Sequence, residues 1–242
     1  VLLLIGLITY VSFTFMDTKL DHQLGVKAKA DPEDEFKASD VKHIFSSRIF
    51  WVVALLCVLY YSAIFPFQKY AVNMLQCNLT FTEVPADSFW ASSSVTIVQY
   101  LIMLVVAATA FTFNFMKNNG AKYSMLACSV IALISYCYMG YMRQSAESIF
   151  AVFPLLAVGI TPVLGNYVDH KGKAASMLVL GSLLLIACHL TFAFILPEFK
   201  GNQVGGVIVA YLTILILGAS FSLVPASLWP SVSKLVDAKV IG

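Results

Sequence analysis

Long apolar runs separated by short polar stretches form the main pattern along the chain. The runs lie at residues 1–16, 49–68, 95–116, 123–142, 149–165, 174–197 and 204–229. A helix of about 20 apolar residues crosses the hydrocarbon core of a bilayer, where no water is present to satisfy free backbone groups. The pattern therefore predicts an all-α polytopic membrane protein with about seven transmembrane helices, the first of them cut short.

Composition supports this prediction and excludes a soluble globular domain. Hydrophobic residues make up 60% of the chain and charged residues 12%, whereas soluble proteins average about half and about a quarter. The lipid bilayer is therefore the predicted partner of most of the chain. A net charge of +2 with scattered basic residues argues against a nucleic acid partner. The five cysteines show no disulfide or metal-ligand spacing, so we expect no metal and no cofactor.

The distribution of Lys and Arg predicts the orientation of the helices. Most of the 15 basic residues lie in the connector 17–48, in the stretches 117–122 and 165–173, and in the tail 234–239. Cytoplasmic loops carry such an excess, so we expect the connector and the C-terminus to be cytoplasmic. A cell membrane, plasma or inner, is the favoured location for this multi-pass protein, and a lysosomal membrane stays open as an alternative.

The connector 17–48 is the one stretch with a polar composition. Asp31 followed by Pro32 and three acidic residues is typical of a helix start, because the positive end of a helix favours anions. We expect a short helix on the membrane surface before the run 49–68. A solvated linker is the alternative.

Ionisable side chains are scarce inside the apolar runs. No Asp, Glu, Lys or Arg lies in their interior, and His189 is the one histidine there. Ionisable groups within a membrane often mark proton pathways, so His189 is a candidate proton relay, with a packing role as the alternative. No set of residues that would support acid, base or nucleophilic catalysis is found, and we expect no enzyme activity.

The most specific local pattern is G-x-x-x-D-x-x-G-K, between the runs 149–165 and 174–197. We expect Gly165 to allow close packing of a helix end and Gly172 to form a sharp turn. Asp169 would sit against the positive N-terminus of another helix, and Lys173 would contact headgroups or acidic side chains. Such a contact would act as a conformational latch. An ordinary polar turn is the alternative.

At these residues the chain resembles the major facilitator superfamily, whose cytoplasmic loops carry this motif. Two further stretches resemble the branch that holds the lysosomal dipeptide carriers of animals and their bacterial relatives. The residues FW at 50–51 and YYSAIFPF at 60–67 resemble its seventh helix, and SLVPASLWP at 222–230 resembles its tenth.

The resemblance implies a fragment that runs from the end of helix six at residues 1–16, through the connector 17–48, to helix ten within the membrane domain 49–242. The other helices of the same protein are missing. Between the stretches that resemble helices seven and eight, a hairpin at 95–142 is inserted. We expect this hairpin to pack on the periphery of the bundle, dimerise or hold a partner.

The resemblance also implies a function. A carrier of this superfamily moves a small polar organic solute by alternating access, and for this branch short peptides are the implied substrates. A carrier needs polar and aromatic side chains near the bilayer midplane, on helices interrupted by Gly or Pro. The substrate-path candidates are Tyr60, Tyr61, Ser222 and Trp229. Helix packing and interfacial anchoring are the alternatives for these residues.

Two other classes of function stay open. About seven spans also fit a seven-helix receptor, although neither an Asp-Arg-Tyr nor an Asn-Pro-x-x-Tyr string is found. A non-transporting membrane subunit would suit the inserted hairpin, but it leaves the interrupted helices and the motif at 165–173 unexplained.

Overall fold

A computed structural model of the chain describes residues 2–24, 45–113 and 115–235. It contains two compact units, one of residues 1–51 with 236–242 and one of residues 52–235. Each unit is described by itself. The surface helix expected to start at Asp31 lies outside the described residues.

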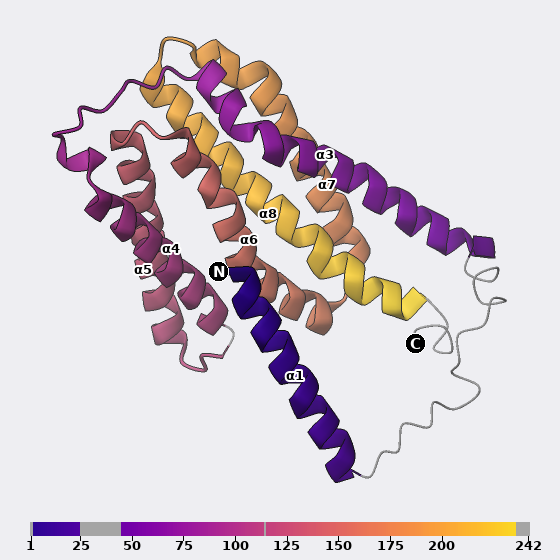
Figure 1. Cartoon of the computed structure of the whole chain (residues 1–242). Helices are drawn as coiled ribbons and strands as arrows, with labels where there is room; N and C mark the ends of the chain where they lie inside the picture. The colour runs from indigo at the N-terminus through magenta and orange to yellow at the C-terminus, as the bar shows by residue number, and fades with distance from the viewer. Residues whose placement is uncertain (1, 25–44, 114, 236–242) are drawn as a thin grey trace. The chain divides into compact units, whose positions relative to one another are not determined.

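Within the described ranges the regular structure is entirely helical (Figure 1). The helices are α1 (Leu2–Leu24), α3 (Arg48–Asn78), α4 (Ser93–Phe113), α5 (Asn119–Met142), α6 (Ala146–Lys171), α7 (Ala174–Leu190) and α8 (Gln203–Leu235), with the short η1 (Phe89–Ala91), η2 (Thr191–Ile195) and η3 (Leu196–Phe199).

Six helices of the described chain are long and apolar enough to cross a membrane: those that contain α3, α4, α5, α6, α7 with its extension, and α8. They correspond to the six full-length runs of the sequence, which confirms the all-α membrane fold. Helix α1 is not among them. Its apolar part ends near residue 16, before the charged side chains of Asp17, Lys19 and Asp21.

Two helices extend well beyond their apolar runs. Helix α3 continues past residue 68 to Asn78 because Ala71 and Leu75 are fully buried in its added turns. Helix α6 runs from Ala146 through Pro154 and Pro162 to Lys171. The sequence places the pattern at 165–173 between two helices, but most of this segment is helical, since only Gly172 and Lys173 separate α6 from α7.

Helix α7 ends in an irregular extension instead of continuing as one regular helix to residue 197. The five residues of η2 form a single π-helical turn and are followed by the 3-10 turn η3. Single π turns inside α-helices are rare and often mark functional sites.

In the first unit, three hydroxyl groups of helix α1 have partners within the helix. The hydroxyls of Ser12, Thr14 and Thr18 each donate to the backbone carbonyl four residues earlier. Large apolar side chains such as Leu4 and Phe13 are exposed. Both features suit a lipid environment, where a hydroxyl without a partner is costly.

Helix α8 is the centre of the second unit. In its membrane-length window 61% of the residues are buried, compared with 28% for α6 and less for the others. It packs between α6 and α7 (Figure 1). The backbone of Gly218 lies against Leu156 and the Phe153 carbonyl of α6, and Gly181 of α7 lies against Val224. Small residues at these crossings let the helices approach closely.

The hairpin of α4 and α5 packs against α6. Within the hairpin, the hydroxyls of Thr109 and Ser129 lie 2.6 Å apart. At the other side, Gly140 of α5 leaves room for the Tyr211 hydroxyl of α8 and for Ser148. The hairpin therefore contacts the central helix of the unit.

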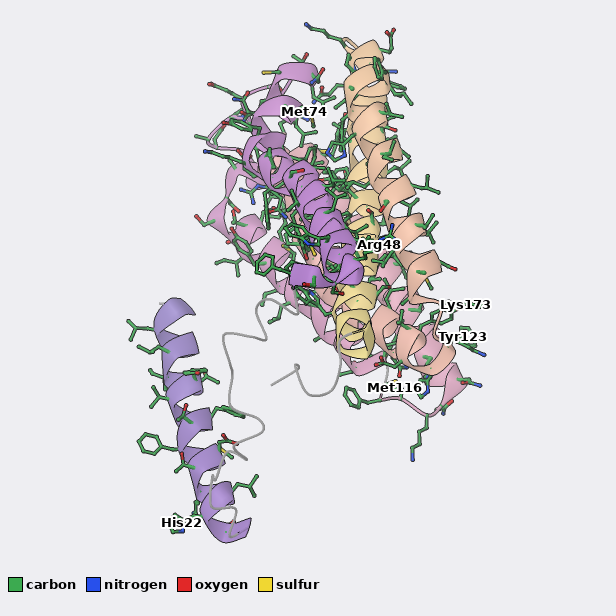
Figure 2. The ribbon with its side chains drawn as sticks, turned by 90° about the vertical axis from the view of Figure 1, so that its right-hand side faces the viewer. His22, Arg48, Met74, Met116, Tyr123 and Lys173 are labelled. Carbon is green, nitrogen blue, oxygen red and sulfur yellow. The ribbon has the colours of Figure 1, made fainter. Side chains whose placement is uncertain are left out.

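The two ends of this bundle differ. At one end Gln203 joins three segments, because its amide oxygen accepts from the Thr80 N–H (3.0 Å) and its amide nitrogen donates to the Gln144 side chain (3.3 Å). We call this the Gln203 end. The Gly172 end holds the connections at 115–118 and 172–173. Figure 2 shows Tyr123 and Lys173 at this end and Met74 at the other.

Candidate functional site

The two tyrosines of α3 have different surroundings. Tyr60 is 4% exposed, and its hydroxyl donates to the backbone carbonyl of Ser220 on α8 at 3.0 Å. Tyr61 is half-buried, and its ring stacks on Phe65 at a centroid distance of 5.3 Å. The Tyr60 hydroxyl thus joins α3 to α8, which is the packing role that the sequence left open beside a place on the substrate path.

The serines of α8 are fully buried at the helix crossings. Ser220 donates to the Gly181 carbonyl of α7 at 2.7 Å. Ser222 donates to Gly218 in its own helix at 2.9 Å and lies 3.4 Å from the Ala157 carbonyl of α6. Together with Tyr60 they form a polar network that connects four helices through the middle of α8.

Trp229 lies near the C-terminal end of α8 and is 61% exposed. Its ring thus lies outside the packed interior of the second unit. Exposure at a helix end suits an interfacial anchor, and it equally leaves the ring free to face a path formed with helices outside this chain.

His189 lies on α7 just before the π turn. Its Nδ1 is 2.9 Å from the Leu185 carbonyl, and the ring packs edge-on against Phe67. Because a carbonyl only accepts, Nδ1 carries the proton of this bond, and in the neutral ring Nε2 is then an acceptor. Nε2 is buried and has no hydrogen-bond partner among the described residues.

His189 also lines a cavity of about 510 Å³ between α3 and α7, together with Tyr60 and Ser182. The remaining lining residues are apolar. The structure therefore brings two of the predicted site residues, Tyr60 and His189, to one cavity. Ser222 and Trp229 do not line it.

The motif residues from Gly165 to Lys173 lie at the Gly172 end. Gly172 has a φ of +70°, as the predicted sharp turn requires, and its N–H donates to the Val168 carbonyl. Asp169 is exposed in the last turn of α6, where the negative end of its own helix disfavours a carboxylate. In the described chain, no atom outside the adjoining helix backbone lies within 4 Å of the position that a Cβ at Gly165 would take, so no close packing is found there.

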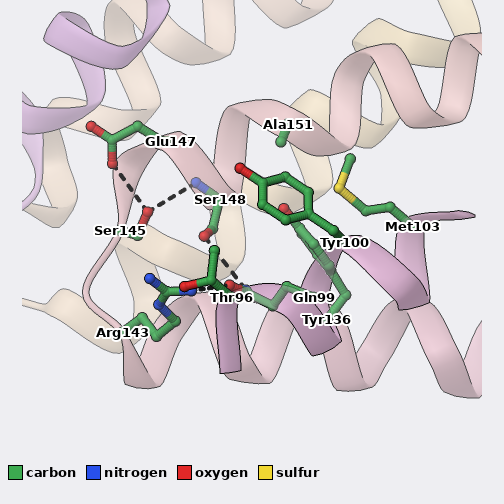
Figure 3. Close-up of a pocket in the computed structure, with 10 residues that line it drawn as sticks. All are labelled: Thr96, Gln99, Tyr100, Met103, Tyr136, Arg143, Ser145, Glu147, Ser148 and Ala151. Atoms are coloured by element: carbon green, nitrogen blue, oxygen red, sulfur yellow. Dashed lines mark hydrogen bonds between the residues drawn. The ribbon is translucent and has the colours of Figure 1, made fainter. Parts of the chain in front are cut away.

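The structure also contains a polar cavity that the sequence analysis missed. It lies between α4, α5 and α6 at the Gln203 end and has a volume of about 320 Å³ (Figure 3). Arg143 donates to the Gln99 side chain at 2.8 Å, and Gln99 in turn lies 3.5 Å from the Ser148 hydroxyl. Two features of the sequence could have indicated this cavity. Gln99 lies inside the apolar run 95–116, and Arg143 directly follows the apolar run 123–142.

Comparison with known proteins identifies distant relatives. The chain is 20% identical over 239 residues to the lysosomal dipeptide transporter MFSD1 of Bos taurus, a match that covers 99% of this chain. The same transporter from Homo sapiens and from Pongo abelii matches at the same identity and coverage of the chain. No protein-family model matches, and no solved structure matches.

The match spans 35% of the bovine relative's length. The chain therefore spans about a third of the curated relatives. Combined with the six membrane-length helices, the similarity supports a multi-pass membrane protein distantly similar to a membrane transporter.

Proposed function

We propose that this chain is part of a secondary transporter that moves a small polar organic solute by alternating access, and that short peptides are its substrates. The observation that carries the proposal is the similarity to dipeptide transporters along nearly the whole chain. The central position of α8, with its buried serines and close glycine crossings, supports it, because a rocking bundle needs helices that slide on small residues. No enzymatic step forms part of this proposal.

The substrate path in this proposal involves the α3 and α8 helices. Tyr61 is the better-placed tyrosine for contacting a solute, since its hydroxyl makes no hydrogen bond to another described residue. The Tyr60 and Ser222 hydroxyls donate to backbone carbonyls in this structure. We propose that they donate to the solute instead when the two halves of the transporter move. Trp229 would close the path at the Gly172 end.

The motif residues Gly165, Asp169, Gly172 and Lys173 are proposed as the latch. Asp169 is exposed, and in this proposal its favourable partner comes from the rest of the protein. Such a partner would stabilise one conformation, with the Gly172 end closed toward the cytoplasm.

His189 is the proposed proton relay. His189 lines the cavity between α3 and α7. Its Nε2 is buried and has no hydrogen-bond partner among the described residues, so this nitrogen is the proton acceptor in the proposal. In this proposal, proton coupling depends on His189, whereas substrate exchange at equal pH does not.

The proposed topology places the connector 17–48 and the C-terminus in the cytoplasm. The Gln203 end would then face the outside of the cell or the lumen of an organelle. The relatives are named lysosomal, so a lysosomal membrane stands beside a cell membrane as the proposed location.

Counterflow in proteoliposomes that contain the complete protein tests the function. Vesicles loaded with an unlabelled dipeptide mixture are diluted into labelled dipeptide, and parallel samples contain amino acids, sugars or organic anions. Saturable uptake of dipeptide alone supports both carrier and substrate class. Uptake of a different solute keeps the carrier and rejects the substrate class, and no uptake of any solute by folded protein rejects both.

A further inference from the structure

The cavity between α4, α5 and α6 at the Gln203 end is lined by polar and charged side chains. These residues play no part in the proposed transport path. The cavity's lining includes Gln99, Tyr100, Tyr136, Arg143, Glu147 and Ser148. Its volume of about 320 Å³ is at the small end of the usual range for ligand pockets. Figure 3 shows the two charged side chains at one side of the cavity and the aromatic rings at the other.

Arg143 is half-buried and is oriented by a buried partner. Gln99 is 5% exposed, and its amide oxygen accepts one N–H of the guanidinium at 2.8 Å. The Arg143 guanidinium has five N–H donors, and among the described residues it makes only this hydrogen bond. No described carboxylate lies within ion-pair distance of it. A partly buried arginine with most of its donors unused is suited to receive a carboxylate, which binds the guanidinium fork in two places.

The start of α6 adds to this positive character. Ser145 is the N-cap, and its hydroxyl accepts from the Ser148 N–H at 3.1 Å. The positive end of a 26-residue helix therefore borders the cavity, and the Ser148 hydroxyl supplies a further hydrogen-bonding group there.

The opposite charge comes from Glu147, which also lines the cavity. One of its carboxylate oxygens accepts from the Ser145 hydroxyl at 3.0 Å. The second oxygen makes no bond to another described residue. A carboxylate here disfavours a ligand that is purely anionic and favours one that also carries a positive group.

We propose that this cavity binds a small zwitterionic solute with a carboxylate and an ammonium group. The ligand carboxylate pairs with Arg143 and Ser148, and the ammonium group pairs with the free oxygen of Glu147. The ligand side chain lies against the rings of Tyr100 and Tyr136. The hairpin thereby forms a second solute site, separate from the residues proposed for the transport path, and this site does not depend on that function.

Arginine-directed chemical footprinting of the complete protein in detergent tests the site. Phenylglyoxal modifies accessible guanidinium groups, and mass spectrometry reports each modified peptide separately. Arg143 and Arg48 are the two arginines of the chain, so Arg48 is an internal control. The probes are alanyl-alanine as the zwitterion, its N-acetyl form as the anion, its amide as the cation, and inorganic phosphate.

We expect alanyl-alanine to protect Arg143 at a concentration about tenfold lower than the N-acetyl form, because a charge-assisted hydrogen bond contributes roughly that factor. Modification of Arg48 should be unchanged by every probe. The isosteric variant Glu147→Gln should remove the preference for the zwitterion. The control Asp87→Asn removes an exposed carboxylate that does not line the cavity and should keep it.

Three outcomes would overturn the proposal. They are no protection of Arg143 by alanyl-alanine, equal protection by phosphate or the N-acetyl form, and a zwitterion preference that survives in Glu147→Gln. Equal protection by phosphate would assign the cavity to anions such as lipid headgroups. Thermal unfolding of each variant in detergent establishes that the footprint is read on folded protein.

Discussion

Single atoms decide how tightly the helices of the second unit pack. Buried hydroxyls of Tyr60, Ser220 and Ser222 each donate to a backbone carbonyl, and two of these bonds join different helices. The Tyr211 hydroxyl is the contrary case, because it is buried against Gly140 and no described residue hydrogen-bonds to it. Removal of a hydrogen-bonded hydroxyl should therefore lower the stability of the protein, whereas removal of the Tyr211 hydroxyl should not.

Substitution of Gly140 tests the contact between the hairpin and α8. A Cβ at this position would overlap the Tyr211 hydroxyl and lie 2.9 Å from the Ser148 Cβ. We expect Gly140→Ala to lower the free energy of unfolding by about 1–3 kcal/mol, as overpacking typically does. Thermal unfolding of the complete protein in detergent measures the change.

The variant Tyr211→Phe provides the matched control. Removing a hydroxyl without a partner should be neutral or slightly stabilising, and it should recover much of the loss in the double variant with Gly140→Ala. A double variant as unstable as Gly140→Ala alone would contradict this account of the contact.

The hydrogen bond from Tyr60 to Ser220 should contribute measurably to stability. Tyr60→Phe removes the bond and should cost about 0.5–1.5 kcal/mol. Tyr61→Phe alters the same kind of side chain one residue later, where the hydroxyl has no described partner, and should have a smaller effect. Equal losses in chemical denaturation would argue against the bond.

At the scale of elements, hydropathy alone located the six spanning helices, because the bilayer thickness fixes both their length and their composition. It did not locate their ends. Helix α3 continues to Asn78 and α6 to Lys171, in turns that lie beyond the apolar run and are stabilised by helix packing instead. For the same reason the pattern at 165–173 gave the turn at Gly172 correctly but not the helix before it.

The proposed latch motif at the Gly172 end gives a kinetic prediction. Asp169→Asn keeps the side chain's size and removes its charge, so we expect slower substrate cycling with little change in binding. The counterflow rate should fall by about tenfold, the factor that corresponds to 1.4 kcal/mol at the transition state. A binding isotherm of the same sample reports affinity.

The control for the latch is Asp87→Asn, which neutralises an exposed carboxylate at the Gln203 end. We expect wild-type cycling in this variant. If Asp169→Asn also cycles at the wild-type rate, the latch assignment is wrong.

The variant His189→Gln tests the proposed proton relay separately from substrate exchange. His189→Gln retains hydrogen-bonding groups but does not titrate, so exchange at equal pH should continue. An imposed pH gradient should no longer drive uptake. Flux measured with and without the gradient distinguishes the two, and a gradient response that persists in the variant would exclude His189 as the relay.

At the scale of the whole molecule, the fold class follows from the sequence, whereas the cavity between the hairpin and α6 does not. Gln99 is 44 positions from its partner Arg143 and 49 positions from its partner Ser148. The packing of α4 on α6 brings these residues together. Side-chain packing between helices of similar hydropathy leaves no periodic signal in the sequence. The resemblance at 60–67 and 222–230 was the more informative signal, since it indicated the transporter relatives.

The central claim is that the complete protein carries a small solute across the membrane. Counterflow of labelled dipeptide into proteoliposomes loaded with unlabelled dipeptide measures this directly, because exchange needs no knowledge of the coupling ion. The account predicts saturable uptake that unlabelled dipeptide outside the vesicles competes away. Absence of exchange for dipeptides and for every other solute class, with protein shown to be folded, would contradict it.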